Sequence, residues 1–122
     1  RTSDNANADS AAWLLRNTTN NEITSFRNAF FALEAISLDT NYRLGSIYDG
    51  TNNTIYINNV AGTPVAATPA WSSPGTLSIS SANTGGGSFW DGPVAEIVIT
   101  NTALSSGDRN SLDAYFTAKW GL

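Results

Sequence analysis

The chain has 122 residues, 13 % of them charged, and a formal net charge of −4 at pH 7. That length suits a single domain with one core. The six Lys and Arg residues are scattered along the sequence, whereas binding to nucleic acid or to anionic lipid needs clustered cations, so we expect neither. The sequence contains no Cys and no His, which excludes disulfides, thiolate metal sites and the commonest general base. No apolar run approaches the roughly 20 residues of a membrane-spanning helix, and membrane insertion is not expected.

From residue 11 onward, short apolar runs alternate with turns rich in Asn, Asp, Gly, Pro and Ser. This spacing predicts an all-β sandwich or barrel. The runs expected to form strands are Ala11–Thr18, Glu22–Arg27, Phe30–Leu38, Tyr42–Tyr48, Thr54–Val60, Thr76–Ser81 and Val94–Thr100.

Two connections have distinct compositions. Residues 49–53, Asp-Gly-Thr-Asn-Asn, have the composition of a tight hairpin loop between two of the predicted strands. Residues 61–75 contain three of the four prolines together with Trp71. Because proline cannot donate to a strand ladder, this stretch is predicted to cross the surface without forming a central strand.

One short helix is predicted near the end of the sequence. Ser105 followed by Asp108 resembles a capping box, Lys119 falls in the last turn, and Gly121 can end the helix. Apolar residues recur at helical spacing at Leu112, Tyr115, Phe116 and Trp120. We expect this apolar stripe to cover an edge or an open end of the sandwich.

Several motifs in residues 44–122 occur in the order found in one family. "IYDGTNNTIYINNV", then "LSIS", a glycine-rich loop and "FWDGPVAEIVITNTALSSGDRNSLDAYFTAKWGL" resemble the second half of laminin-G-like, concanavalin A-like jelly-roll domains. The resemblance implies a two-sheet antiparallel jelly-roll sandwich with a short C-terminal helix, spanning residues 1–122 as one domain. Members of the family are longer, so we expect a C-terminal or processed piece of a longer chain. Upstream sequence, a neighbouring copy or another protein of the same assembly is then expected to supply the missing strands.

Two adjacent aromatic residues, Phe89 and Trp90, precede an Asp-Gly turn. The resemblance implies that the Trp90 ring is buried inside the sandwich, where large aromatic side chains usually pack. Successive side chains of an extended segment point to opposite faces, which makes Phe89 the candidate for an exposed ligand contact.

The carboxylates do not form a catalytic pattern, and we predict that the protein is not an enzyme. Glycanases of this fold carry a Glu-x-Asp-x-x-Glu strand, which this sequence lacks. Glu34 and Asp39 are five positions apart, a spacing that puts them on opposite faces of a strand. Glu96 is expected on a strand covered on both sides, where its carboxylate accepts hydrogen bonds.

Ligand binding remains open at the loops. Asp49, Asn52 and Asn53 offer hard oxygen ligands for calcium, which laminin-G-like domains often bind at a loop rim, although Asp and Asn are also the residues that tight turns prefer. Candidates for sugar contact are Tyr48, Trp71, Phe89, Asn52 and Asn53. Aromatic faces bind apolar sugar C–H patches, but such residues equally serve as core or cross-strand partners.

Two functions fit these observations. The first is a non-catalytic binding or adhesion module, extracellular or on a virion surface, that recognises glycans or host surfaces. The second is a structural module, such as a capsid decoration or fibre domain, that binds only neighbouring copies or other proteins of its own assembly.

Overall fold

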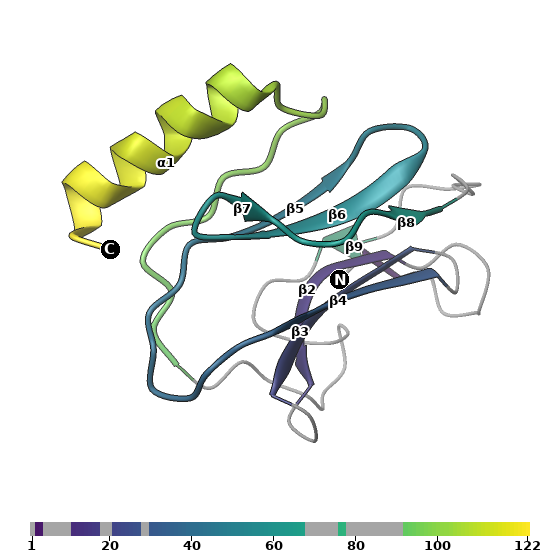
Figure 1. Cartoon of the computed structure of the whole chain (residues 1–122), viewed down its shortest axis with the longest axis horizontal. Helices are drawn as coiled ribbons and strands as arrows, with labels where there is room; N and C mark the ends of the chain where they lie inside the picture. Colours follow the sequence, from purple (N-terminus) through teal and green to yellow (C-terminus); the bar gives the residue numbers. More distant parts are fainter. Residues whose placement is uncertain (1, 4–10, 18–20, 28–29, 68–75, 78–91) are drawn as a thin grey trace.

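A computed structural model describes residues 2–3, 11–17, 21–27, 30–67, 76–77 and 92–122, with side chains described in 21–25, 32–67 and 92–122. Within these ranges the strands form two antiparallel sheets, and a single helix lies near the C-terminal end (Figure 1). The prediction of a mostly β fold with a C-terminal helix is confirmed at this level.

The first sheet has the strand order β4-β3-β2-β1-β9. Its strands are β1 (Thr2–Ser3), β2 (Ala11–Asn17), β3 (Glu22–Arg27), β4 (Phe30–Ala35) and β9 (Thr76–Leu77). β3 has the predicted bounds and pairs with β4 along its whole length. β4 ends three residues earlier than predicted, because the chain turns at Leu38 and Asp39, where Asp39 has a φ of 53°.

The second sheet is built around β6 (Asn52–Ile57), which pairs with β5 (Leu44–Tyr48) on one edge. The predicted hairpin between them is confirmed, with Tyr48 opposite Asn53. β6 stops before the predicted Val60, because Asn58 and Asn59 have positive φ angles of 49° and 66°. Asn tolerates this left-handed conformation, and the pair makes the two-residue turn that leads into β7.

Part of the predicted crossing at residues 61–75 forms short strands. β7 (Val60–Ala61) and β8 (Val65–Ala66) both pair with β6, near its end and near its start. Each has two residues, so they cover the second edge of β6 without forming a long strand. Residues 68–75, which include Trp71, lie outside the described residues.

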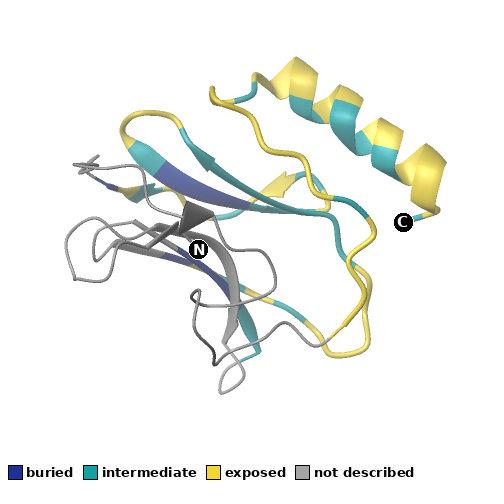
Figure 2. Ribbon diagram, turned by 180° about the vertical axis from the view of Figure 1, so that it is seen from behind, coloured by how far each residue is buried: buried dark blue, intermediate teal, exposed yellow. Residues whose placement is uncertain are grey.

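The core lies between the two sheets, where β3 and β4 face β6 (Figure 2). Ile23 and Ile55 have no exposed surface, and Ala32 is nearly as buried. Ile36, Leu44, Ile57 and Val65 pack around them half-buried. This apolar contact holds the sheets face to face in a sandwich-like arrangement.

A buried polar cluster lies beside this core and consists of Ser25 on β3, Ser46 on β5 and Asn53 on β6. The two serine hydroxyl oxygens are 2.6 Å apart. The Asn53 amide nitrogen donates to the Ser25 carbonyl oxygen at 3.2 Å and to its hydroxyl at 3.0 Å. The Asn53 amide oxygen lies 3.3 Å from each hydroxyl. These bonds satisfy polar groups that would otherwise be costly to bury.

The prediction of a strand at Val94–Thr100 is wrong. These residues pair with none of the described strands and run beside the helix. Val94, Ile97, Val98 and Ile99 are 46–50 % exposed. The Glu96 carboxylate hydrogen-bonds with side chains of the helix instead of lying between sheet layers.

Helix α1 spans Ser106–Trp120 and begins and ends as predicted. The Ser105 hydroxyl accepts from the Asp108 N–H at 3.2 Å. Gly121, with a φ of 69°, donates its N–H to the Thr117 carbonyl oxygen at 3.0 Å. No helix in the described ranges combines the length and apolar character needed to cross a membrane.

Polar contacts attach α1 to the second sheet. Arg43 forms an ion pair with Asp113, and Asn59 donates to Asn110 at 2.7 Å. The Arg109 guanidinium lies 4.4 Å from the centre of the Tyr56 ring. Leu112 and Phe116 are half-buried, while Tyr115 and Trp120 are exposed. The predicted apolar stripe therefore packs only in part, and it faces the second sheet.

Candidate functional site

The β5–β6 loop, residues 49–51, is held by its own hydrogen bonds. One Asp49 carboxylate oxygen accepts from the N–H groups of Thr51, at 2.8 Å, and Asn52, at 2.7 Å. These backbone donors hold the pKa of Asp49 below its ordinary value. Gly50 supplies the positive φ of 98° that the turn requires.

The loop residues predicted to bind a ligand lie in different environments. The Tyr48 hydroxyl is 2.7 Å from the Gly50 carbonyl oxygen and 3.2 Å from that of Ala67. Asn52 is half-buried at the first position of β6. The next residue, Asn53, is 3 % exposed and points into the buried polar cluster. We therefore leave Asn53 out of the proposed ligand contacts.

Two of the predicted calcium ligands, Asp49 and Asn53, lie in different surroundings. Asp49 is exposed on the loop, whereas the Asn53 amide oxygen lies between the sheets. Across the described residues, no group of three or more His, Cys, Asp or Glu side chains is placed to hold a metal ion. Trp71, Phe89 and Trp90 lie outside the described residues.

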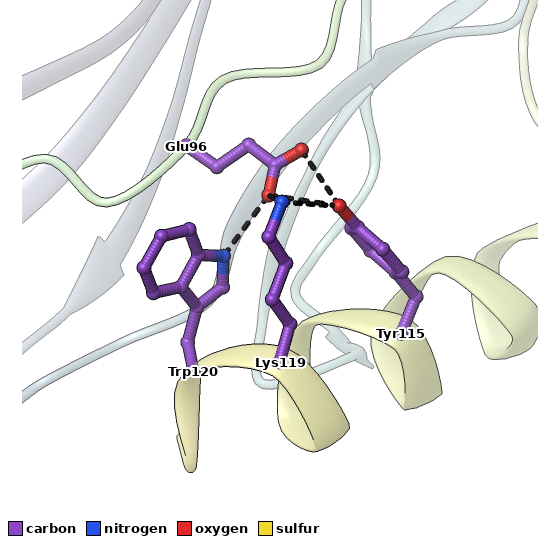
Figure 3. Close-up of polar contacts among 4 residues, drawn as sticks. All are labelled: Glu96, Tyr115, Lys119 and Trp120. Atoms are coloured by element: carbon purple, nitrogen blue, oxygen red, sulfur yellow. Dashed lines mark hydrogen bonds and ion pairs between the residues drawn. The ribbon is translucent and has the colours of Figure 1, made fainter.

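A second group of side chains converges where α1 meets the segment that precedes it (Figure 3). Tyr115, Lys119 and Trp120 of α1 all point toward Glu96, and we call these four residues the Glu96 cluster. The Trp120 indole N–H donates to Glu96 Oε2 at 3.0 Å, and Lys119 Nζ donates to the same oxygen at 3.1 Å. The Tyr115 hydroxyl lies 3.1 Å from Oε1 and 3.2 Å from Oε2. Lys119 Nζ is also 2.6 Å from the Tyr115 hydroxyl.

The spacing of these residues on the helix explains their convergence. Tyr115 and Lys119 are four residues apart, so they lie on the same face of the helix, one turn apart. Trp120 is the last residue of α1, and the left-handed Gly121 ends the helix immediately after it. Glu96 reaches all three side chains from the neighbouring extended segment.

The cluster keeps both of its charges at neutral pH. The hydrogen bond from the Trp120 indole, followed by that from Lys119, lowers the pKa of Glu96. The Tyr115 hydroxyl and the Glu96 carboxylate raise the pKa of Lys119. The Lys119 nitrogen also lies 5.1 Å from the centres of both aromatic rings, within the range of a cation–π contact.

The rings of the Glu96 cluster stay open to water. Tyr115 is 43 % exposed and Trp120 is 42 % exposed, although large aromatic side chains are usually more buried than this. The cluster thus places two aromatic surfaces beside an ionised acceptor and an ionised donor. Such groups can hold a polar ligand that also has an apolar face.

Sequence reasoning missed this site because Tyr115 and Trp120 were assigned to the packing stripe of the helix. The polar groups of these two side chains, a phenol and an indole N–H, together with Lys119 on the same helix face, could have indicated a polar site. Glu96, the one charged residue in an otherwise apolar stretch, was expected to accept hydrogen bonds. It does so, from the helix.

The other glutamate considered for catalysis, Glu34, has a structural contact. Its Oε1 accepts the N–H of Thr63 at 2.8 Å. Its side chain also lies where a Cβ on Gly62 would be. Glu34 therefore ties β4 to the connection between β7 and β8.

Comparison of the chain with protein-family models, with curated proteins and with solved structures finds no match.

Proposed function

We propose that this chain is a non-catalytic binding module, of laminin-G-like jelly-roll type, that recognises glycans or a host surface. It acts outside the cell or on a virion surface, as part of a larger assembly. The observation that carries this proposal is the exposure of Tyr115 and Trp120 beside the ionised Glu96–Lys119 pair. Sugars offer apolar C–H faces for such rings and hydroxyl groups for such charges.

The state of Glu96 supports a binding role over a hydrolytic one. A general acid in a glycosidase needs a raised pKa, whereas three donors lower the pKa of this carboxyl. Retaining hydrolysis also needs a second carboxyl about 5 Å away. The described polar partners of Glu96 are a phenol, an ammonium and an indole.

A glycan array probed with the labelled 122-residue chain tests the proposal. We expect binding to a restricted set of glycans, and no release of reducing sugar when those glycans are incubated with the protein. An array without any bound glycan would contradict the recognition of glycans, and turnover that is lost on Glu96→Gln would contradict a non-catalytic role.

A second candidate function, a purely structural module, is favoured by the segment at residues 94–99. Its Val and Ile side chains are about half exposed, and exposed apolar patches often mark contacts between proteins. Sedimentation equilibrium distinguishes this function, because a structural module should self-associate at micromolar concentration. Replacement of Ile97 and Ile99 by Thr should then abolish the association while leaving the fold intact.

A further inference from the structure

We infer that the Glu96 cluster is itself the ligand contact and that it takes a neutral sugar with two adjacent free hydroxyl groups. This inference rests on the proposed function and goes further by naming the site and the class of sugar. It follows from the hydrogen-bonding capacity that the cluster has left, from its charges and from the exposure of its rings.

One oxygen of the Glu96 carboxylate can accept a further hydrogen bond. Among the described residues, Glu96 Oε2 accepts from Trp120 and Lys119 and lies within reach of Tyr115. Oε1 has only the Tyr115 hydroxyl as a partner. Each carboxylate oxygen can accept about two hydrogen bonds. Oε1 can therefore accept one more, from a ligand.

The ammonium group has one unused donor beside that acceptor. Lys119 Nζ carries three N–H bonds, and the described partners use two of them, the Glu96 carboxylate and the Tyr115 hydroxyl. An acceptor and a donor thus lie next to each other. Two neighbouring hydroxyl groups match them, because one can donate to the carboxylate while the other accepts from the ammonium.

The rings supply the apolar half of the contact. The indole N–H of Trp120 donates a hydrogen bond to Glu96. This bond fixes the orientation of a ring that is still 42 % exposed. A ring that is already fixed loses little conformational freedom when a ligand stacks on it. The C–H face of a pyranose is the complementary surface.

Charge makes the site selective for neutral sugars. A sugar carboxylate or sulfate has no proton to donate to the remaining acceptor site of Glu96 Oε1 and would be repelled by that oxygen, and the chain's net charge of −4 adds to the effect. Lys119, the one lysine of the sequence, already pairs with Glu96 Oε2 and lies over both rings. An added cation would therefore have to displace it.

NMR titration with matched glycosides tests the inference. The probes are methyl β-D-glucopyranoside and methyl β-D-glucuronide, which differ in the carboxylate at C6, together with the methyl glycosides of galactose and mannose. The signals followed are the indole N–H of Trp120 and the ¹³Cε–H signal of Lys119, in protein made with ¹³C-labelled lysine, which leaves the ammonium group unmodified. We expect at least one neutral glycoside to shift both signals saturably and the glucuronide to bind about tenfold more weakly.

Variants locate the contact. Trp120→Ala and Glu96→Gln should each weaken binding about tenfold, whereas Asn41→Ala, at an exposed position outside the cluster, should leave it unchanged. Trp120→Phe keeps a ring and should lose less affinity than Trp120→Ala. It also provides a readable variant if Trp120→Ala fails to fold, as judged from the amide spectrum.

The outcomes separate this inference from the proposed function. A glycan on the array whose binding is lost on Asn52→Ala but not on Trp120→Ala would overturn the site and leave the proposed function standing. Equal affinity for the glucoside and the glucuronide would overturn the ligand class. If array glycans bind but no neutral methyl glycoside shifts either signal, the inference is wrong and the proposed function stands. An array with no bound glycan would contradict both the inference and the recognition of glycans in the proposed function.

Discussion

Replacing Asn53 by Ala should destabilise the protein more than any other single Asn→Ala change among the described residues. Asn53 is 3 % exposed, and its amide links the two sheets through Ser25 and also contacts Ser46 of its own sheet. The change removes the amide but leaves the 2.6 Å contact between the two serine hydroxyls. The Ser25 carbonyl oxygen loses one of its donors.

The size of the effect follows from the number of bonds that can exist together. The amide nitrogen makes two bonds to Ser25. The amide oxygen accepts at most one at a time from the two serine hydroxyls, because these also bond to each other. Three bonds at a net value of about 1 kcal/mol each give about 3 kcal/mol. Water entering the vacated polar space would lower this toward about 2 kcal/mol.

Urea unfolding followed by far-ultraviolet circular dichroism measures this change. With a slope of about 1.5 kcal/mol per molar urea, a loss of about 3 kcal/mol moves the midpoint down by about 2 M. Ser46→Ala should cost about 1 kcal/mol, and the double variant less than the sum of the two, because the groups share hydrogen bonds. The control is Asn41→Ala, at an exposed position, which should change stability by less than about 0.5 kcal/mol. An Asn53→Ala variant as stable as this control would refute the reasoning.

Four further predictions concern the helix, its Glu96 contact and the β5–β6 loop. The lowered pKa of Glu96 means that its contribution to stability is present above the ordinary value of 4.5 and is lost as pH falls toward the folded-state value. The melting temperatures of wild type and Glu96→Gln should therefore differ at pH 6 and converge toward pH 3. A difference that stays constant with pH would contradict a stabilising role for the ionised Glu96 carboxylate. Ser105→Ala should cost about 1 kcal/mol by removing the N-cap. Gly121→Ala should cost a similar amount, about 1 kcal/mol, because its φ of 69° strains a residue with a Cβ. No loss in urea unfolding for either variant would count against the capping geometry. Asp49→Ala should speed hydrogen exchange at the Thr51 amide, which donates a hydrogen bond to that carboxylate. An unchanged exchange rate would show that Asp49 does not hold the loop.

The elements that could be predicted from the sequence are those whose signals are local. β3, the β5–β6 hairpin and both ends of α1 depend on residues within a few positions of one another, such as Ser105 with Asp108. The end of β6 was missed because the predicted strand was extended to the apolar Val60 across Asn58 and Asn59, which are turn-forming residues. The positive φ angles of both residues show that they form a turn.

Other features depend on partners far along the chain. Residues 94–100 have strand-like composition, but a strand also needs a neighbour to complete its ladder, and composition does not supply one. Asn52 and Asn53 look alike in the sequence, yet β6 begins at Asn52, so Asn53 faces the other sheet. Tyr115 and Trp120 fit an apolar stripe until Glu96, 19 and 24 positions away, draws their polar ends toward it.

The polar attachment of α1 has a consequence for the order of events in folding. Its bonds to the second sheet join residues that are far apart, 70 positions for Arg43 with Asp113 and 51 for Asn59 with Asn110. Its bonds to Glu96 span only 19 to 24 positions. Closing a shorter loop loses less chain entropy, and capped helices and tight hairpins form faster than long-range contacts. The helix with its Glu96 contact and the β5–β6 hairpin are therefore two units that can each form early, and the pairing of Arg43 with Asp113 belongs to the later step that joins them.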